Sequence, residues 1–467
     1  MISSSIDSYK ASRYNVLIPL KGGATLAYSS AGNTLAVWDE YEKKIYKAVS
    51  NHAGDGEALG VAGNKRYLDS VLENLLKGSF IIEADRDEKK KIDEVVRMLR
   101  FREGHMGFTI APTLDCNFAC DYCYQGEHAA GAMPESVAKK IIDFIKRRSE
   151  GLESLSVAWY GGEPLLRLDV IDALSQKLIA LCGERKILYG ASIVTNGYLL
   201  TNDAAQVLVN NKISSVQVTL DGDRDVHDRR RVLRSGGPTF DVIMKNLRDA
   251  AQNDKLRIAI RVNIDRRNRD SIEALIDSLC AAGLGERANF TVYFAPVDIC
   301  SLECLKVADE VMPLEEYAAL EADLLKMAFT RKLAIPSMPF RMFSLCGAVR
   351  PNSFVILPNG DVHKCWNTVS DSSQRLCGID EIENVSESRL QNDWIRHNLF
   401  STSECEDCDT LVNCAGGCAN VSMMGVANPC RSLRYNMKKQ LALFALSKKA
   451  IKADDIIDPI VAEFLGR

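Results

Sequence analysis

The residues best placed to do chemistry are three closely spaced cysteines, Cys116, Cys120 and Cys123, in a C-x3-C-x2-C arrangement. Three thiolates from one loop can bind three irons of a four-iron cluster and leave the fourth iron open to an outside ligand. The alternative is a structural zinc ion, which needs four protein ligands. This loop holds no fourth cysteine and no histidine, since His105 precedes it and His128 follows it.

A second group of cysteines lies between residues 346 and 430, among turn-forming segments such as PNGD and AGGC. We expect a chain without a signal peptide to stay in the cytosol, where thiols are kept reduced. Metal binding is therefore the first interpretation of its 15 cysteines, ahead of disulfide formation. A zinc ribbon would use one C-x2-C pair and leave several thiols without a partner. The seven are Cys346, Cys365, Cys405, Cys408, Cys414, Cys418 and Cys430. The five scattered cysteines are Cys182, Cys280, Cys300, Cys304 and Cys377.

Alternating apolar runs and amphipathic stretches predict six βα units that position the first cysteines. Units of one connectivity predict a parallel sheet, curled into a partial or full barrel with its active site at the carboxyl ends of the strands. The predicted strands are Phe108–Leu114, Ser154–Tyr160, Gly190–Thr195, Ser215–Leu220, Arg257–Ile264 and Asn289–Ala295. The predicted helices include Pro134–Arg148, Leu168–Leu181, Phe240–Ala251 and Asp270–Ala282.

Four regions follow from these patterns. Residues 1–107 form a small α+β module, strand-rich first and helical later, and residues 108–330 form the barrel, which ends with a helix near Leu314–Thr330. Residues 331–435 are cysteine-rich and turn-rich, and residues 436–467 form a tail that is helical as far as Ile451.

Composition bounds the partners and the location. The net charge of −4 gives no attraction for nucleic acid or for an anionic membrane. The first residues lack the apolar core of a signal peptide, and no run of eighteen apolar residues occurs. We expect a cytoplasmic protein with no nucleic-acid or membrane partner.

The cysteine triplet, with Tyr122 before its last cysteine, resembles the signature loop of the radical S-adenosylmethionine (SAM) superfamily. Trp159-Tyr160 is followed by Gly161, Gly162, Glu163 and Pro164, which resemble the family's GGEP motif for the amino group of SAM; alone, they could be a tight turn before a helix. The resemblance implies a partial (β/α)6 barrel, a SAM-binding [4Fe–4S] cluster and a 5′-deoxyadenosyl radical. Further expected contacts with SAM or the active site are Thr195, Asn196, Thr219, Asp221 and Arg261.

Two further observations concern residues on or just after a predicted strand. His227-Asp228-Arg229 follows the fourth strand at the spacing of the subfamily. Arg261 and Asn263 share a face of the fifth strand by parity. A buried salt bridge is an equal alternative for Arg261.

The later cysteines match the SPASM extension of radical SAM enzymes, which carries two auxiliary [4Fe–4S] clusters. The resemblance covers about residues 108–435 and implies three clusters in all. It assigns Cys346, Cys365 and Cys418 to the cluster nearer the barrel, and Cys405, Cys408, Cys414 and Cys430 to the outer one. The nearer cluster then has three thiolates; Cys377 could be a fourth, although an apolar residue would suit its position. An open iron there could bind a substrate thiolate.

Two subfamilies differ in the reaction. Anaerobic sulfatase-maturing enzymes have a catalytic aspartate after the cysteine that is Cys365 here, and this chain has Trp366, which counts against formylglycine formation. Maturases of ribosomally made peptides form thioether or carbon–carbon bonds, and many bind the leader of the precursor by strand addition to an N-terminal winged-helix-like module. Residues 14–107 have the size of such a module, although they could simply pack on the barrel.

The expected reaction is therefore a thioether cross-link of the sactipeptide or ranthipeptide type in a precursor peptide. The substrate radical couples to a sulfur on the open auxiliary iron, and a reductant such as flavodoxin or ferredoxin supplies electrons. With no open iron, carbon–carbon coupling or simple oxidation is favoured. Oxidation of a protein in the manner of the sulfatase-maturing enzymes is a further alternative, and a non-catalytic zinc-binding interaction protein is the remotest one.

Overall fold

The computed structural model describes residues 5–126, 131–333, 337–339, 346–397, 403–425 and 430–466. Its largest feature is a nine-stranded, mostly parallel sheet in the order β11-β10-β9-β8-β7-β6-β12-β13-β14. Six parallel strands follow one another in sequence order. They are β6 (His105–Ile110), β7 (Ser154–Trp159), β8 (Leu188–Thr195), β9 (Ile213–Thr219), β10 (Arg257–Ile264) and β11 (Phe290–Pro296).

All six strands were predicted, because parallel strands covered by helices are apolar enough to stand out in a sequence. The first strand begins at His105, three residues earlier than expected, and ends at Ile110. The loop before Cys116 is therefore longer than the sequence indicated. The strand ends place the sequence-predicted site residues along one edge of the sheet, because parallel strands share their carboxyl edge.

Helices connect these strands and pack on the sheet through apolar faces. The core contains Ile141, Leu178, Ile243 and Leu275 from the helices, and Trp159 is fully buried among them. Side-chain caps begin several of the helices; Asp223, for example, accepts a hydrogen bond from Val226 N at 2.9 Å. The helices are α5 (Glu135–Arg147), α6 (Leu168–Arg185), α7 (Asn202–Asn210), α8 (Arg224–Arg230), α9 (Phe240–Ala250) and α10 (Ile272–Ala281).

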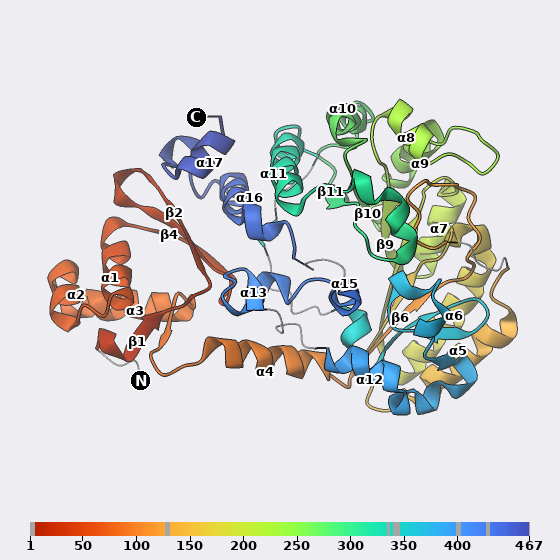
Figure 1. Cartoon of the computed structure of the whole chain (residues 1–467), viewed down its shortest axis with the longest axis horizontal. Coiled ribbons are helices and arrows are strands. Elements are labelled where there is room, and N and C mark those ends of the chain that lie inside the picture. The colour runs from red at the N-terminus through yellow and green to blue at the C-terminus, as the bar shows by residue number, and fades with distance from the viewer. Residues whose placement is uncertain are drawn as a thin grey trace.

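The N-terminal elements have a core of their own and lie at the other end of an elongated molecule, with α4 (Glu88–Arg100) reaching from them toward the central sheet (Figure 1). A three-stranded antiparallel sheet contains β2 (Asn15–Pro19), β3 (Thr25–Ser29) and β4 (Thr34–Trp38). A separate antiparallel pair contains β1 (Tyr9–Ala11) and β5 (Ile81–Glu83). The helices are α1 (Glu40–Ser50), α2 (Asp55–Ala62) and α3 (Lys65–Lys77).

The cysteine-rich region extends the central sheet. Strand β12 (Ser353–Ile356) pairs in parallel with β6, and β13 (Asp361–His363) and β14 (Cys377–Gly378) continue the sheet antiparallel. Its short helices are α12 (Arg389–Arg396), α13 (Ser403–Glu406), α14 (Leu411–Cys414) and α15 (Ala419–Met424).

The C-terminal tail packs against other parts of the protein. Its helices are α16 (Leu433–Ser447) and α17 (Pro459–Phe464), and they pack on β2 and β3 and on α11 (Leu314–Thr330). The tail therefore joins the N-terminal sheet to the rest of the protein. Among the described helices, none is long and apolar enough to cross a membrane.

Candidate functional site

The first set of thiols, Cys116, Cys120 and Cys123, lies in the loop after β6. Backbone hydrogen bonds hold this loop against the chain after α8, where Ala119 N donates to Val232 O at 2.9 Å. Burial raises the pKa of Cys116 and raises that of Cys120 to about 12, and each of these thiols interacts electrostatically with the others of the set. The three thiols therefore lie in one loop, where their charges act on one another, and their role as cluster ligands stays a prediction.

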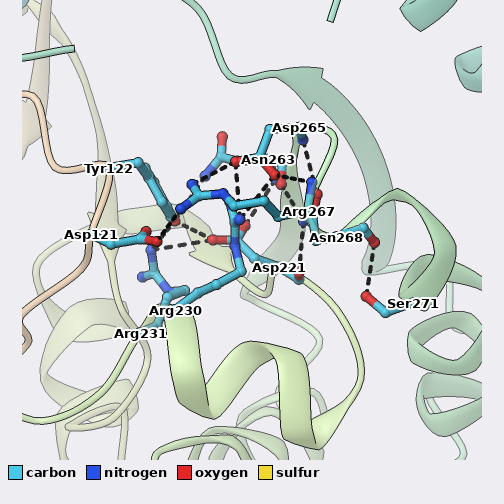
Figure 2. Close-up of polar contacts among 10 residues, drawn as sticks. All are labelled: Asp121, Tyr122, Asp221, Arg230, Arg231, Asn263, Asp265, Arg267, Asn268 and Ser271. Atoms are coloured by element: carbon cyan, nitrogen blue, oxygen red, sulfur yellow. Dashed lines mark hydrogen bonds and ion pairs between the residues drawn. The ribbon is translucent and has the colours of Figure 1, made fainter. Parts of the chain in front are cut away.

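Tyr122 is anchored by a buried polar network at the ends of β9 and β10 (Figure 2). Its hydroxyl donates to the Asp221 carboxylate and accepts from Arg231 Nη1 at 2.6 Å. The other carboxylate oxygen of Asp221 accepts from Asn263 N at 2.9 Å, and Asp221 N donates to His227 Nδ1 at 3.2 Å. Asp221 and His227 are fully buried. Both residues therefore position the cysteine loop.

A second group in Figure 2 ties the same loop to the end of β10. Arg230 Nη1 contacts both carboxylate oxygens of buried Asp265 at 3.0 Å. Arg267 bridges Asp265, at 2.8 Å, and Asp121 of the loop, at 2.6 Å. Asn268 accepts from Asp265 N at 2.9 Å and holds the turn after the strand. The loop is thus fixed by charge-assisted bonds at Asp121 and at Tyr122.

The glycines after β7 allow two loops to touch. Gly162 N donates to Thr113 O at 3.2 Å, and Glu163 N donates to Asp115 O at 2.8 Å. A Cβ on Gly161 would lie 2.2 Å from Thr113 O, and one on Gly162 would lie 2.2 Å from two backbone oxygens of the cysteine loop. The sequence predicted close approach to a ligand, which stays a prediction, and the contact that excludes a side chain here is with the protein's own backbone.

Glu163 joins the ends of β7 and β8. Its fully buried carboxylate accepts hydrogen bonds from Thr195 Oγ1 at 2.7 Å, from Asn196 N at 2.7 Å and from Leu165 N at 2.9 Å. Burial raises the pKa of Glu163. A carboxylate has about four acceptor positions, so about one remains for a ligand. Asn196 Nδ2 continues the chain of contacts to Asn117 Oδ1 at 2.7 Å, within the cysteine loop.

The remaining predicted residues lie along the same edge of the sheet. Arg261 Nε donates to Asn263 Oδ1 at 2.7 Å, which confirms that the two share a face. Thr219 is paired with Arg261 across β9 and β10. Pro164 opens the short helix η3 (Pro164–Arg167). Arg261 is not in a salt bridge among the described residues; its guanidinium lies 5.9 Å from the Tyr293 ring centroid.

Four later cysteines line one small cavity together with Arg431 and Arg434. Burial raises the pKa of Cys414 to about 11, and the other three thiols interact with it electrostatically. Arg434 Nη1 donates to Cys430 Sγ at 3.4 Å. This outer set is the one the sequence predicted: Cys405, Cys408, Cys414 and Cys430.

The proximal set, Cys346, Cys365 and Cys418, is a separate gathering. Burial raises the pKa of Cys365 to about 12, and the other two thiols add to the effect. Each cysteine directly precedes a short helix. The backbone N–H groups of Ala348 and Asn367, two residues further along the chain, lower the pKa of Cys346 and Cys365 against the effect of burial.

These arrangements suit iron–sulfur clusters, which are held by cysteine thiolates. No group of three or more His, Cys, Asp or Glu in the described parts of the chain is spaced to hold a single metal ion. His105 contacts Ser154 and Ser156 instead of the cysteine loop, and His128 lies outside the described residues. Cys377 is buried in the core of the central sheet, which confirms its packing role.

Aromatic side chains connect the first and proximal sets. Tyr124 donates to Tyr160 Oη at 2.6 Å, and the Tyr160 ring meets Trp366 edge-on at a centroid distance of 4.0 Å. Trp366 directly follows Cys365, and its buried Nε1 has no hydrogen-bond partner among the described residues. This donor is available to a ligand between the two sets.

Sequence reasoning missed three residues at this edge. Arg231 is buried, and its charge lowers the pKa of Cys116, Cys120 and Glu163 against the effect of burial. The run of three arginines after Asp228 was the available signal. Two cysteines counted as scattered, Cys300 and Cys304, lie together with a sulfur–sulfur distance of 3.6 Å. Their C-x3-C spacing after the last strand was the corresponding signal.

Comparison with known proteins places this site in a family. Residues 110–279 match the model of the Radical SAM superfamily. The chain is 26% identical over 326 residues to mycofactocin maturase MftC of Mycobacterium tuberculosis, which covers 66% of this chain and 76% of that protein. It is 31% identical over 144 residues to the serine-type anaerobic sulfatase-maturating enzyme of Bacteroides thetaiotaomicron, covering 28% of this chain and 33% of that protein.

Solved structures share the fold. Streptococcus suis SuiB bound to precursor peptide SuiA has a TM-score of 0.52 at 17% identity and covers 91% of this chain and 98% of that one. The enzyme anSMEcpe with bound AdoMet has a TM-score of 0.55 at 19% identity and covers 73% and 97%. The match to the superfamily and the relationship to MftC replace the zinc-binding interaction protein as an interpretation. The chain contains a radical SAM domain, and the protein is a radical SAM enzyme.

Proposed function

We propose that the protein matures a ribosomally made precursor peptide by installing a thioether cross-link. The observation that carries this proposal is the arrangement of ten cysteines in three sets, one inside the radical SAM domain and two in the chain that follows it. Its similarity to a mycofactocin maturase over two thirds of its length supports a peptide substrate. On this proposal residues 108–330 form a partial barrel, residues 331–435 a SPASM domain and residues 436–467 a helical tail.

The three sets would hold three [4Fe–4S] clusters. The first set would bind the SAM cluster, and the proximal and outer sets would bind the two auxiliary clusters. When bound, these groups supply a 5′-deoxyadenosyl radical that removes a hydrogen atom from the peptide, and an acceptor for the electron released as the cross-link forms. Joining a carbon radical to a thiol releases one proton as well. We expect the starting electron to come from flavodoxin or ferredoxin in the cytoplasm.

The chain's own residues would bind and orient SAM. The remaining acceptor position of Glu163 and the backbone of Gly161 and Gly162 suit an ammonium group. Arg231 is a buried cation whose charge lowers the pKa of Cys116 and Cys120, and it suits a carboxylate. The further proposed contacts are Tyr122, Pro164, Thr195, Asn196, Thr219, Asp221 and Arg261.

Replacing Gly162 with alanine is expected to reduce SAM cleavage at least about tenfold. The new Cβ would force the β7 loop away from the cysteine loop, and overpacking of this kind costs about 1–3 kcal/mol. Production of 5′-deoxyadenosine by the reconstituted variant measures the effect. The matched control is Gly183→Ala, because a Cβ on Gly183 meets nothing within 4 Å. Equal rates for the two variants would contradict the proposed role of this contact.

The N-terminal elements offer a place for a leader peptide. Strand β4 is an edge of its sheet, since β3 is its only neighbour among the described strands. A cleft of about 390 Å³ lies between β4 and α3, lined by Val37, Val71, Leu75 and Phe80 among others. Val37 is 45% exposed. An open strand edge beside an apolar cleft suits an extended peptide, whose main chain adds to the sheet. We therefore retain residues 14–107 as the proposed leader-binding module.

Changing Val37 to aspartate is expected to weaken binding of the precursor at least about tenfold, because it puts a charge in an apolar cleft. Cleavage of SAM without peptide should not change. Titration of a fluorescent precursor peptide measures the affinity. Met98→Asp is the control, since Met98 is 66% exposed and does not line the cleft. If both variants bind as tightly as the unchanged protein, the leader binds elsewhere.

The bond itself can be identified by mass spectrometry. We expect the product to have lost two hydrogen atoms and one alkylatable thiol, with fragments that place the link at a cysteine sulfur. A product that keeps every thiol would instead show carbon–carbon coupling. Carbon–carbon coupling is the second candidate, and the position of Cys300 favours it. A fourth cysteine on the proximal cluster would leave no iron open to a substrate sulfur. Formylglycine formation has less support, because Trp366 follows Cys365 where the sulfatase-maturing enzymes have an aspartate.

A further inference from the structure

The proximal set has three thiols, whereas a four-iron cluster bound only by cysteine needs four. The segment between Cys346 and Cys365 contains no other cysteine, and Cys377 is buried in the core of the central sheet. Any fourth protein ligand must therefore come from outside this segment. The inference below rests on the proposed auxiliary clusters.

The loop after β11 brings one cysteine to the proximal set. Asn420 Nδ2 donates to Cys300 O at 2.7 Å. Asn420 is 4% exposed and lies two residues after Cys418, in the first turn of α15. On the other side of the loop, Ser301 Oγ donates to Tyr124 O at 3.3 Å, just beyond the first set. Cys300 is therefore held between two thiol sets by contacts on both sides.

The side chains of Cys300 and Cys304, both in this loop, differ in what they contact. The Cys300 thiol interacts electrostatically with Cys418 and with Tyr160, which lies in the gap between the first and proximal sets. Cys304 is 3% exposed and contacts Ser301 Oγ at 3.4 Å and Cys300 Sγ at 3.6 Å. Cys300 is thus the cysteine of this pair whose backbone contacts α15, two residues from Cys418, whereas Cys304 contacts Ser301 and Cys300. Two sulfurs this close cannot both bind separate irons, so only one can be a ligand.

We infer that Cys300 supplies the fourth thiolate of the proximal auxiliary cluster. Its sulfur forms a bond to iron, and the thiol proton leaves to solvent. Cys304 remains a thiol that hydrogen-bonds the ligand sulfur, a contact of the kind that adjusts cluster potentials. The cluster then has no iron free for a substrate sulfur. The electron released in cross-linking would then pass to the auxiliary clusters without any bond between iron and the substrate. This holds for a thioether and for a carbon–carbon bond.

The test uses full-length protein in which Cys116, Cys120 and Cys123 are alanine, so that only auxiliary clusters are counted. We expect about eight irons per chain and no three-iron signal in electron paramagnetic resonance after mild oxidation. Adding Cys300→Ala should release about one iron per chain on oxidation and produce that signal. Adding Cys304→Ala instead should leave the iron content and the absence of the signal unchanged.

A second measurement needs no change at Cys300. Adding 2-mercaptoethanol to the triple variant should leave the spectrum of the reduced auxiliary clusters unaltered, since no iron is open. A spectrum that shifts with this thiol, or a three-iron signal before Cys300 is replaced, would overturn the inference. Failure of the proposed function looks different: a triple variant without bound iron has no auxiliary clusters at all.

Discussion

Replacing Cys116, Cys120 and Cys123 together with alanine is expected to abolish cleavage of SAM while the auxiliary clusters remain. No other described thiols gather at the end of β6, and iron content should fall by about four per chain. The measurement is 5′-deoxyadenosine production with dithionite as reductant, alongside iron and sulfide analysis. Because the auxiliary sets lie in another part of the chain, the variant should keep about eight irons.

The control for this variant is Cys280→Ala. Cys280 lies in α10, where its thiol donates to Arg331 O at 3.6 Å, away from all three sets. It should keep normal iron content and cleavage. Cleavage that survives in the triple variant would show that another set binds SAM, and would contradict the assignment of the first set.

Changing Arg230 to methionine is expected to lower the free energy of unfolding by about 1–3 kcal/mol, because it removes hydrogen bonds to buried Asp265 while Arg267 still pairs with that carboxylate. The side chain of Arg230 is 5% exposed and that of Asp265 is fully buried, so the substitution leaves a buried carboxylate with Arg267 as its remaining cation. The same change removes the guanidinium that lies 5.1 Å from the Tyr122 ring centroid. Anaerobic urea unfolding of the reconstituted protein measures the loss.

Helix α8 supplies a matched control. Arg224 pairs with Asp241 at 2.8 Å, but these side chains are 62% and 65% exposed. Surface pairs of this kind contribute about 0–1 kcal/mol, so Arg224→Met should be nearly neutral. Equal losses from the two variants would show that the Arg230 contact does not stabilise the loop.

The repeating part of the fold was predictable because burial leaves a periodic trace. The six parallel strands and helix Leu314–Thr330 appear where apolar spacing placed them. The cysteine sets were predictable because their spacing resembles a known family. The extension of the central sheet by β12 was not, because a short strand among turns has no period long enough to detect.

The supporting contacts could not be predicted, because they join residues far apart in sequence. The hydroxyl of Tyr122 accepts a hydrogen bond from Arg231, which is 109 residues away in sequence. Asn420 donates one to the backbone of Cys300, which is 120 residues away. The glycines of the GGEP motif were expected to approach a ligand, which stays a prediction, and the structure adds that the backbone of Thr113 and Leu114 leaves no room for a Cβ there. Spacing in the sequence indicates which residues could take part in catalysis. The contacts that position those residues form only in the folded protein.

The central claim is tested most directly by following both products of one reaction. Reconstituted enzyme, SAM, reductant and a precursor peptide encoded beside the gene would be incubated without oxygen. The account predicts one 5′-deoxyadenosine for each peptide that loses two hydrogen atoms, and no modified peptide from the triple cysteine variant. Formation of 5′-deoxyadenosine with no change in the mass of any such peptide would contradict peptide maturation, although the protein would remain a radical SAM enzyme.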